Sequence, residues 1–161
     1  DYLAQHPSVI PPIQKETYFT YTHHDDPDRA FRSFFPLQSE LDDLAKQTGG
    51  SAMTGEATPE TMFTARTATR AHSAAPDAKI IALIREPIAR AYSHHKHNMR
   101  FKLETVADFA RAIDLEAERT EAALARFESD EHGVFNRTLN DHTYMVRGRY
   151  AEQVERRYKL W

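Results

Sequence analysis

The stretch KIIALIREP, residues 79–87, decides which fold class this sequence is expected to adopt. Residues 79–85 form an almost unbroken apolar run with β-branched side chains, a pattern typical of a strand that is covered on both faces, as in a parallel sheet. Pro87 then occupies a favourable first position of a helix. A strand followed by a polar turn and a helix N-terminus is the unit with which α/β folds hold anions.

The remaining segments mostly predict helices. Apolar spacing indicates two short helices over residues 30–35 and 37–44, the second closed by Gly49. A third helix is expected from Pro59 to about residue 71 with Thr58 as its N-cap, a fourth from about residue 105 to residue 127, and a last one from near residue 148. We therefore expect an α/β chain rich in helix.

Both ends of the sequence favour a piece of a longer domain. Residues 1–7 resemble the last turns of a helix stopped by Pro7, and the final apolar spacing is still running at Trp161. A single buried strand also cannot form a sheet by itself. The sequence thus predicts one domain over residues 1–161 that is truncated at both ends.

Composition excludes several classes of protein. The 161 residues are 40% hydrophobic and 28% charged with a net charge of −3, as in an ordinary globular domain that is not membrane-spanning. The absence of cysteine excludes a disulfide scaffold, a thiol nucleophile and a thiolate metal site, and favours a cytoplasmic location. Nothing in the sequence indicates an oligomeric state.

Charge is distributed unevenly along the chain. Residues 79–102 carry six cations against the single anion Glu86, whereas residues 103–131 carry nine carboxylates against three arginines. The acidic block is typical of a solvated helix face. The basic block indicates a phosphate or sulfate ligand, and nucleic acid is the weaker interpretation because the isoelectric point is near 6.3 and no recognition motif is present.

Four segments, in order along the chain, resemble sulfotransferases that use 3′-phosphoadenosine-5′-phosphosulfate (PAPS), in particular the heparan-sulfate N- and O-sulfotransferase branch. The segments are KETYF at residues 15–19, GEATP at residues 55–59, REPIARAYS at residues 85–93 and YMVRGRY at residues 144–150. The resemblance implies a P-loop-like three-layer fold with a central parallel sheet, here incomplete, with PAPS as co-substrate and no required metal.

The resemblance also implies roles for individual residues. Arg85 and Ser93 match the pair that grips the 3′-phosphate, and Arg90 of the same segment is counted with the cofactor-binding residues. A guanidinium fork gives paired charge-assisted bonds to such a dianion, and a hydroxyl adds another donor. For each residue alone, an ordinary surface position is the competing interpretation.

Glu16 matches the general base of the family, and its neighbour Lys15 is included with the catalytic residues. Sulfuryl transfer is an in-line displacement, so a carboxylate must accept the proton of the attacking hydroxyl or amine while cations stabilise the leaving phosphate. His97 falls where N-sulfotransferases have a histidine near the sulfuryl group. A surface Lys–Glu pair is the competing interpretation of residues 15 and 16.

Departures from the family pattern leave the acceptor open. The loop that binds the 5′-phosphosulfate is expected before residue 1 and a second cofactor loop after residue 161, so the segment alone is expected to bind PAPS poorly and not to turn over. Tyr18 replaces a common histidine and His94 replaces an aromatic residue. The acceptor is therefore expected to be a small molecule or a carbohydrate, carrying a hydroxyl or an amine.

Three alternatives remain. A metal bound by His94, His95 and His97 is disfavoured because only two of these share a helix turn and no third ligand is at metal spacing. A P-loop small-molecule kinase would need a GxxxxGK[ST] loop and an aspartate for Mg²⁺, and neither is visible. A non-catalytic anion- or nucleotide-binding domain would use the same arginines for docking alone.

Overall fold

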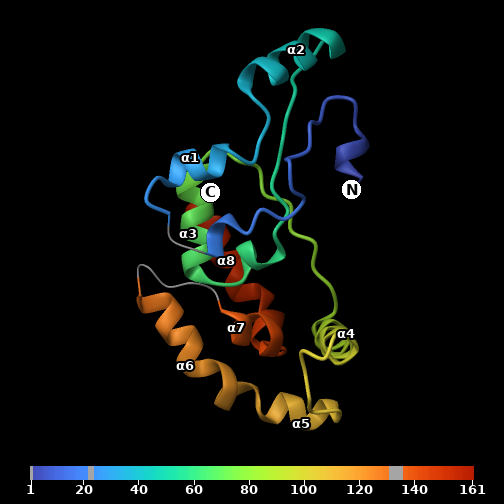
Figure 1. Cartoon of the computed structure of the whole chain (residues 1–161), viewed down its shortest axis with the longest axis vertical. Helices are drawn as coiled ribbons and strands as arrows, with labels where there is room; N and C mark the ends of the chain where they lie inside the picture. The colour runs from blue at the N-terminus through green and yellow to red at the C-terminus, as the bar shows by residue number, and fades with distance from the viewer. Residues whose placement is uncertain (1, 22–23, 131–135) are drawn as a thin grey trace. The chain divides into compact units, whose positions relative to one another are not determined.

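The computed structural model describes residues 2–21, 24–130 and 136–161 (Figure 1). The chain divides into two compact units. Unit 1 comprises Asp1–Phe19 and His24–Thr61, and unit 2 comprises Thr20–His23 and Met62–Trp161. We call the four segments that resemble sulfotransferases the resemblance segments. Those at residues 15–19 and 55–59 fall in unit 1, and those at residues 85–93 and 144–150 fall in unit 2.

Unit 1 contains two α-helices with clear end signals. Helix α1, Pro27–Arg32, begins at Asp26, whose carboxylate accepts the backbone N–H of Arg29 at 3.1 Å. Helix α2, Gln38–Thr48, ends at Gly49, whose φ of 69° is in the left-handed region that glycine adopts without strain. The predicted glycine stop is confirmed. A 3-10 turn, η1, covers Leu3–Gln5.

Unit 2 holds most of the helical structure. Its α-helices are α3 (Ala65–Ala74), α4 (Pro87–Arg100), α5 (Phe109–Asp114), α6 (Glu116–Ser129), α7 (Arg137–His142) and α8 (Tyr150–Leu160). The 3-10 turn η4 covers Val146–Gly148, and η2 (Phe19–Tyr21) and η3 (Pro59–Met62) lie where the chain passes between the units. Helix α6 packs on α7, and α3 packs on α8.

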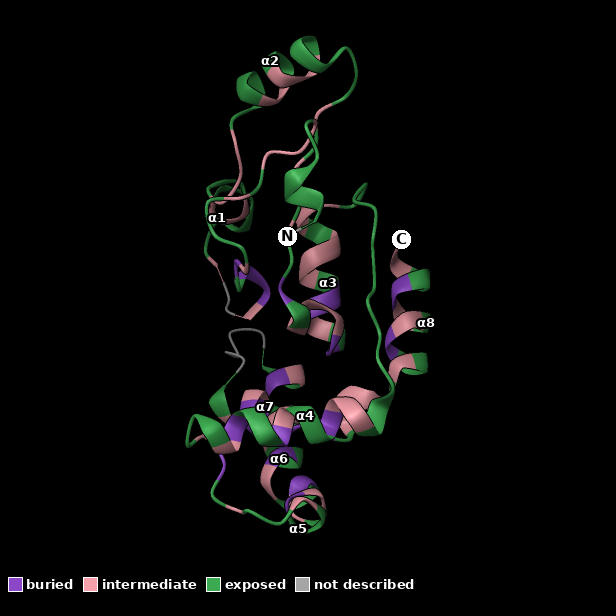
Figure 2. Ribbon diagram, turned by 90° about the vertical axis from the view of Figure 1, so that its right-hand side faces the viewer, coloured by how far each residue is buried: buried purple, intermediate pink, exposed green. Residues whose placement is uncertain are grey.

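Two hydrophobic clusters form the core of unit 2. The first contains Phe63, Phe127 and Leu139, and the second contains Ala91, Ala112 and Tyr144. Figure 2 shows that the helices of this unit alternate between buried and exposed residues, as amphipathic helices do. No helix in the described ranges is long and apolar enough to cross a membrane.

The predicted central parallel sheet is wrong for the residues that the structure describes. They contain no strand, and their one β-bridge joins Val9 and Met53. Residues 79–85 are extended but exposed, with Leu83 at 95% exposure, and they lead into α4 as a green trace in Figure 2. The apolar run has the composition of a buried strand, but no described segment pairs with its backbone, and a strand without a neighbour is not a sheet.

Two predicted helix starts are also wrong. The Thr58 hydroxyl accepts the backbone N–H of Tyr18, forty residues away, instead of capping an α-helix. Thr58 precedes only the 3-10 turn η3, and Thr64 caps α3 instead by accepting the backbone N–H of Thr67. Asp108, not Thr105, caps α5 by accepting from Arg111 at 2.7 Å.

The acidic block of residues 103–131 is not simply a solvated face. Glu116 is 4% exposed and accepts the backbone N–H groups of Met145 at 2.6 Å and Val146 at 2.9 Å. Glu128 accepts the backbone N–H of Ala65, in the first turn of α3, at 3.0 Å. These carboxylates therefore hold the ends of neighbouring segments in place.

Glu104 is the most deeply paired of these carboxylates. Its side chain is 1% exposed, forms an ion pair with Arg119 at 2.8 Å and accepts the hydroxyl of Tyr144 at 2.9 Å. Burial by itself would raise the pKa of Glu104, but the backbone N–H groups of Val106 and Thr105 together with Tyr144 and Arg119 outweigh it and lower the pKa from 4.5 to about 2.

A matched pair of leucines tests the assignment of core and exposed residues. Leu139→Ala removes a fully buried side chain and is expected to lower the free energy of unfolding by about 2 to 5 kcal/mol. Leu83→Ala, at an exposed position of the extended segment, should change it by less than about 0.5 kcal/mol. Urea denaturation measures both, and a comparable loss for Leu83→Ala would show that the segment is buried.

The low pKa of Glu104 predicts a stability loss in acid. A carboxyl with a depressed folded pKa contributes its full stabilisation above its unfolded pKa, and the contribution disappears as the pH falls from about 4.5 to about 2. Between pH 7 and pH 2.5, the free energy of unfolding of the wild type should fall by on the order of 2 to 3 kcal/mol more than that of Glu104→Gln.

Denaturation at a series of pH values measures this difference. Glu155→Gln, at an exposed carboxylate paired with Lys159 at 2.7 Å, is the control and should follow the wild-type profile. Parallel profiles for the wild type and Glu104→Gln would contradict the assignment.

Candidate functional site

In unit 1, the two resemblance segments are joined by the carboxylate of Glu56. Its Oε1 accepts the backbone N–H of Thr17 at 3.2 Å and the Thr17 hydroxyl at 3.0 Å, and it also accepts from the backbone and hydroxyl of Thr58. The Thr58 hydroxyl in turn accepts the backbone N–H of Tyr18 at 3.1 Å. The structure thus fixes residues 17 and 18 on the loop of residues 56–58.

Glu16, the predicted base, lies next to this junction. Its side chain is half-buried, and its Oε2 accepts the hydroxyl of Tyr18 at 2.5 Å. The hydrogen bond to Glu16 is the main cause that raises the pKa of Tyr18 to about 12, with burial and the negative charges of Glu16 and Glu60 adding to it. The phenol of Tyr18 therefore keeps its proton at neutral pH and donates a hydrogen bond to Glu16. Lys15 is exposed.

In unit 2, Arg85 is exposed and stands directly before the first turn of α4. Glu86 caps that helix and accepts the backbone N–H groups of Ile88 at 2.9 Å and Ala89 at 2.5 Å, and these bonds lower the pKa of Glu86. Two of the N–H groups at the helix end are therefore occupied, in contrast to the expectation that they would hold an anion. An anion bound here would depend on side chains.

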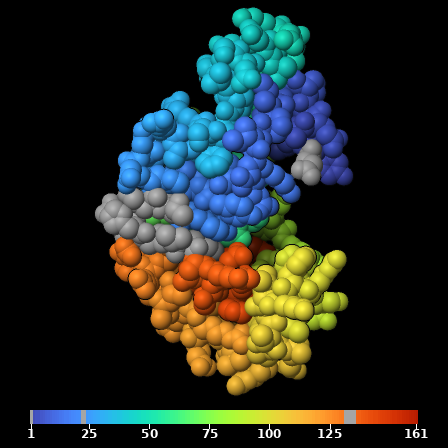
Figure 3. Space-filling view, in the orientation of Figure 1, coloured from blue at the N-terminus to red at the C-terminus, as the bar shows by residue number. Residues whose placement is uncertain are grey.

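Ser93 and His97 share one exposed face of α4. They are four residues apart, so their side chains are neighbours on the helix surface. Lys96 and Arg100 are exposed beside them, and the ring of His97 lies 4.7 Å from that of Phe101. In the space-filling view, the yellow atoms, which include the C-terminal half of α4, lie at the surface of unit 2 (Figure 3). The structure brings a hydroxyl, an imidazole and two cations onto one surface.

Arg90 differs from these exposed residues, because its side chain is half-buried and hydrogen-bonded to the backbone of the chain. Its Nη2 donates to the carbonyl oxygen of Tyr144, and burial is the main cause that lowers the pKa of Arg90. Its buried Nε has no hydrogen-bond partner among the described residues. Its assignment to the cofactor stays a prediction, and the structure adds a role in packing.

The third and fourth resemblance segments also pack against each other. Besides the bond from Arg90 to Tyr144, a Cβ at Gly148 would come within 3.1 Å of the Cβ of Pro87, so glycine allows the close approach. Gln153 donates to the carbonyl oxygen of Arg147 at 3.1 Å and so ties the start of α8 to the same turn. The four segments are thus joined in pairs, one pair within each unit.

The other histidines of α4 have structural surroundings. Burial is the main cause that lowers the pKa of His94 to about 3, with the charges of Arg147 and Arg90 adding to it, so His94 is neutral at pH 7. His95 is buried, and its Nε2 lies 2.8 Å from the carbonyl oxygen of Val106. The described residues contain no group of three histidines or carboxylates placed to hold a metal ion.

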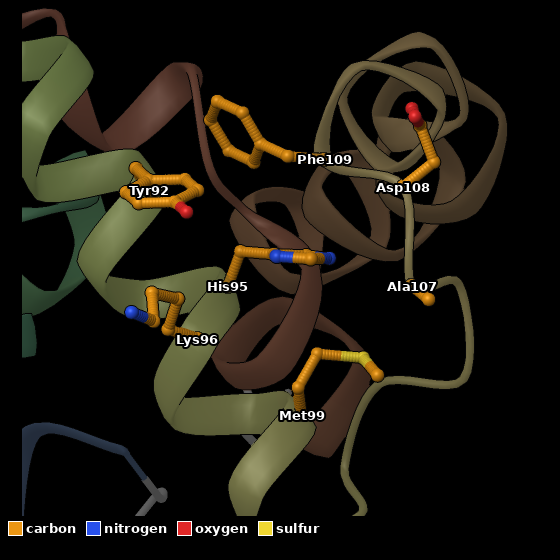
Figure 4. Close-up of a pocket in the computed structure, with 7 residues that line it drawn as sticks. All are labelled: Tyr92, His95, Lys96, Met99, Ala107, Asp108 and Phe109. Carbon is orange, nitrogen blue, oxygen red and sulfur yellow. The ribbon is translucent and has the colours of Figure 1, made fainter.

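A hollow of about 360 Å³ lies between α4 and the start of α5 (Figure 4). Its lining consists of Tyr92, His95, Lys96, Met99, Ala107, Asp108 and Phe109. Three of the polar side chains here already have partners: Lys96 lies over the Tyr92 ring, His95 contacts Val106, and Asp108 caps α5. None of the residues predicted for catalysis or cofactor binding lines this hollow.

Glu56 is the residue that sequence reasoning missed. It lies inside a quoted segment, but its partners Thr17 and Tyr18 are about forty residues away in sequence, and no local spacing rule relates them. From the sequence, Tyr18 stands out only as a departure from the family pattern. The only sequence feature that could have indicated Glu56 is its position between a glycine and an alanine, and that pattern is too common to predict a structural role.

Comparison with known proteins gives one informative match. No family model and no curated protein sequence matches this chain. The crystal structure of a sulfotransferase from Alicyclobacillus acidocaldarius matches with a TM-score of 0.63 and 28% sequence identity, over 99% of this chain and 61% of that chain. This chain therefore spans less than two thirds of the length of that sulfotransferase. The match does not distinguish the heparan-sulfate branch, but it shows that this chain has a sulfotransferase-like fold.

Proposed function

We propose that the protein is a PAPS-dependent sulfotransferase and that this chain supplies its general base and its 3′-phosphate contacts. The observation that carries the proposal is the similarity to a sulfotransferase over 99% of the chain. The four resemblance segments support it, because each unit packs two of them against each other through specific bonds. The acceptor is a hydroxyl or an amine, on a small molecule or a carbohydrate.

The reaction is an in-line displacement at sulfur. The acceptor oxygen or nitrogen forms the new bond to sulfur while the bond from sulfur to the 5′-phosphate oxygen breaks, and adenosine 3′,5′-bisphosphate leaves. Glu16 accepts the proton that the acceptor loses. As in phosphoryl transfer, positioning and electrostatic stabilisation carry most of the catalysis, so the cations beside the leaving group matter as much as the base.

The residues proposed for the nucleotide suit a doubly charged phosphate. Arg85 offers a guanidinium fork at the surface, and Ser93 offers a hydroxyl on the exposed face of α4. Lys96 and Arg100 add positive charge beside Ser93. His97, four residues after Ser93, is proposed to stabilise charge on the leaving group, and Lys15 is proposed to act beside Glu16. No role in this mechanism requires a metal.

Arg85→Ala tests the phosphate contact. In the full-length protein, it should weaken binding of adenosine 3′,5′-bisphosphate by about 2 to 4 kcal/mol, because one partner of a charged bond is removed. Isothermal titration calorimetry measures the affinity. Lys79→Ala is the control. It removes an exposed cation at the other end of the extended residues 79–85, and this variant should bind the bisphosphate like the wild type.

Unchanged affinity in Arg85→Ala would remove Arg85 from the site. The same titration with ATP and Mg²⁺ separates a sulfotransferase from a small-molecule kinase. A sulfotransferase should prefer the 3′,5′-bisphosphate, whereas a preference for ATP with Mg²⁺ would contradict the proposal.

Glu16→Gln tests the base. This variant should still bind the bisphosphate while the transfer rate falls by about 10²- to 10⁴-fold, the usual contribution of a positioned general base. Transfer of labelled sulfate from PAPS to an acceptor measures the rate. Glu60→Gln removes a carboxylate whose charge also reaches Tyr18, and it should retain activity. Full activity in Glu16→Gln would show that another residue accepts the proton.

A further inference from the structure

We propose that Tyr18 is a positioning residue that holds the carboxylate of Glu16 in one orientation. Oε1 of Glu16 is then free to take the proton that the attacking hydroxyl or amine of the acceptor loses. The inference rests on the proposed function of Glu16 as base. In this proposal Tyr18 acts through its contact with Glu16 and does not itself touch the reacting atoms. The residue is one of the departures from the family pattern, so its role has to come from this chain's own geometry.

The first observation is the hydrogen bond between the two side chains. The Tyr18 hydroxyl donates to Glu16 Oε2 at 2.5 Å, a short bond of the kind formed between a hydroxyl and a charged oxygen. Glu16 Oε1 has no hydrogen-bond partner in the part of the chain that the structure describes. One carboxylate oxygen is therefore fixed while the other can receive a proton.

The second observation is the backbone of Tyr18. Its φ of 53° lies in the left-handed region, which is unfavourable for a residue with a large side chain and persists only where the surroundings hold it. The bond from the Tyr18 N–H to Thr58 and the two bonds from Thr17 to Glu56 hold the chain at and before this position. The strained residue is thus the one that contacts the proposed base.

The residue after Tyr18 is also fixed. Phe19 is 4% exposed, and its ring packs at 5.1 Å from the ring of Phe31 and at 4.7 Å from that of His24. Residues 17 and 19 are therefore anchored while the Tyr18 ring, 42% exposed, turns to Glu16. A simple surface pair would not need anchors on both sides of a strained residue.

A titration that needs no activity tests the pair. The phenolate absorbance of Tyr18, taken as the difference between the wild type and Tyr18→Phe, should show ionisation near pH 12. In Glu16→Gln, the same difference should move toward pH 10, by more than one unit, because the charged acceptor is gone. Glu60→Gln should shift it less, since the charge of Glu60 is the smallest of the causes that raise the pKa of Tyr18.

A spectroscopic measurement at pH 7 covers the case in which the protein unfolds in strong base. With tyrosine labelled at ¹³Cζ, the Tyr18 signal should move on Glu16→Gln and stay in place on Glu60→Gln. No response of Tyr18 to Glu16→Gln in either measurement would overturn the proposal.

Kinetics of the full-length protein then test the positioning role. Tyr18→Phe should lower kcat by about tenfold with KM and bisphosphate affinity unchanged, because the base is misoriented while binding is intact. Tyr18→His, which keeps a donor, should restore most of kcat, whereas Tyr18→Leu should not. Tyr158→Phe, at a tyrosine that is 84% exposed, is the control and should leave kcat unchanged.

The outcomes separate this proposal from the function on which it rests. If Glu16→Gln is inactive but Tyr18→Phe is fully active, the proposal that Glu16 is the general base holds and the positioning role of Tyr18 is overturned. If Glu16→Gln is fully active while the titration shows the pair, Glu16 is not the base, and the positioning role falls with it.

Discussion

Carboxylate oxygens that accept backbone N–H groups from distant segments hold the loops of both units in place. Glu56 does so for residue 17 in unit 1, and Glu116 does so for residues 145 and 146 in unit 2. Where the described chain has no sheet to pair its extended backbone, these donors need other partners, because a buried unpaired N–H group is costly. A charged acceptor forms stronger bonds than a neutral one, which suits loops that must keep one conformation.

The same bonds hold the backbone next to the candidate site residues within each unit. In unit 1, the Glu56 and Thr58 contacts fix the backbone that carries Glu16 and Tyr18. In unit 2, the bond from Arg90 to Tyr144 and the close approach of Gly148 to Pro87 fix the start of α4, next to Arg85. Specific hydrogen bonds therefore fix the backbone around the predicted residues, and rigid support of this kind is what a functional side chain requires.

The sequence predicted the features that depend on local physics. Gly49 ends α2, and Pro87 begins α4, because left-handed backbone and a fixed φ are properties of single residues. Strand pairing is not such a property: residues 79–85 have the composition of a buried strand, yet they are exposed and unpaired within the described structure. The prediction that Thr58 caps a helix is wrong for a related reason, since its hydroxyl accepts the backbone N–H of Tyr18, forty positions away. For the site, sequence resemblance selected Glu16, Arg85 and Ser93, but it could not supply the Glu56 contacts or the hydrogen bond from Tyr18.

The proposed function depends most on Arg85 and Ser93 holding the 3′-phosphate of the nucleotide. A crystal structure of the full-length protein with adenosine 3′,5′-bisphosphate tests it most directly. The Arg85 guanidinium and the Ser93 hydroxyl should both lie within hydrogen-bond distance of the 3′-phosphate oxygens. A nucleotide bound elsewhere, with both side chains in solvent, would contradict it.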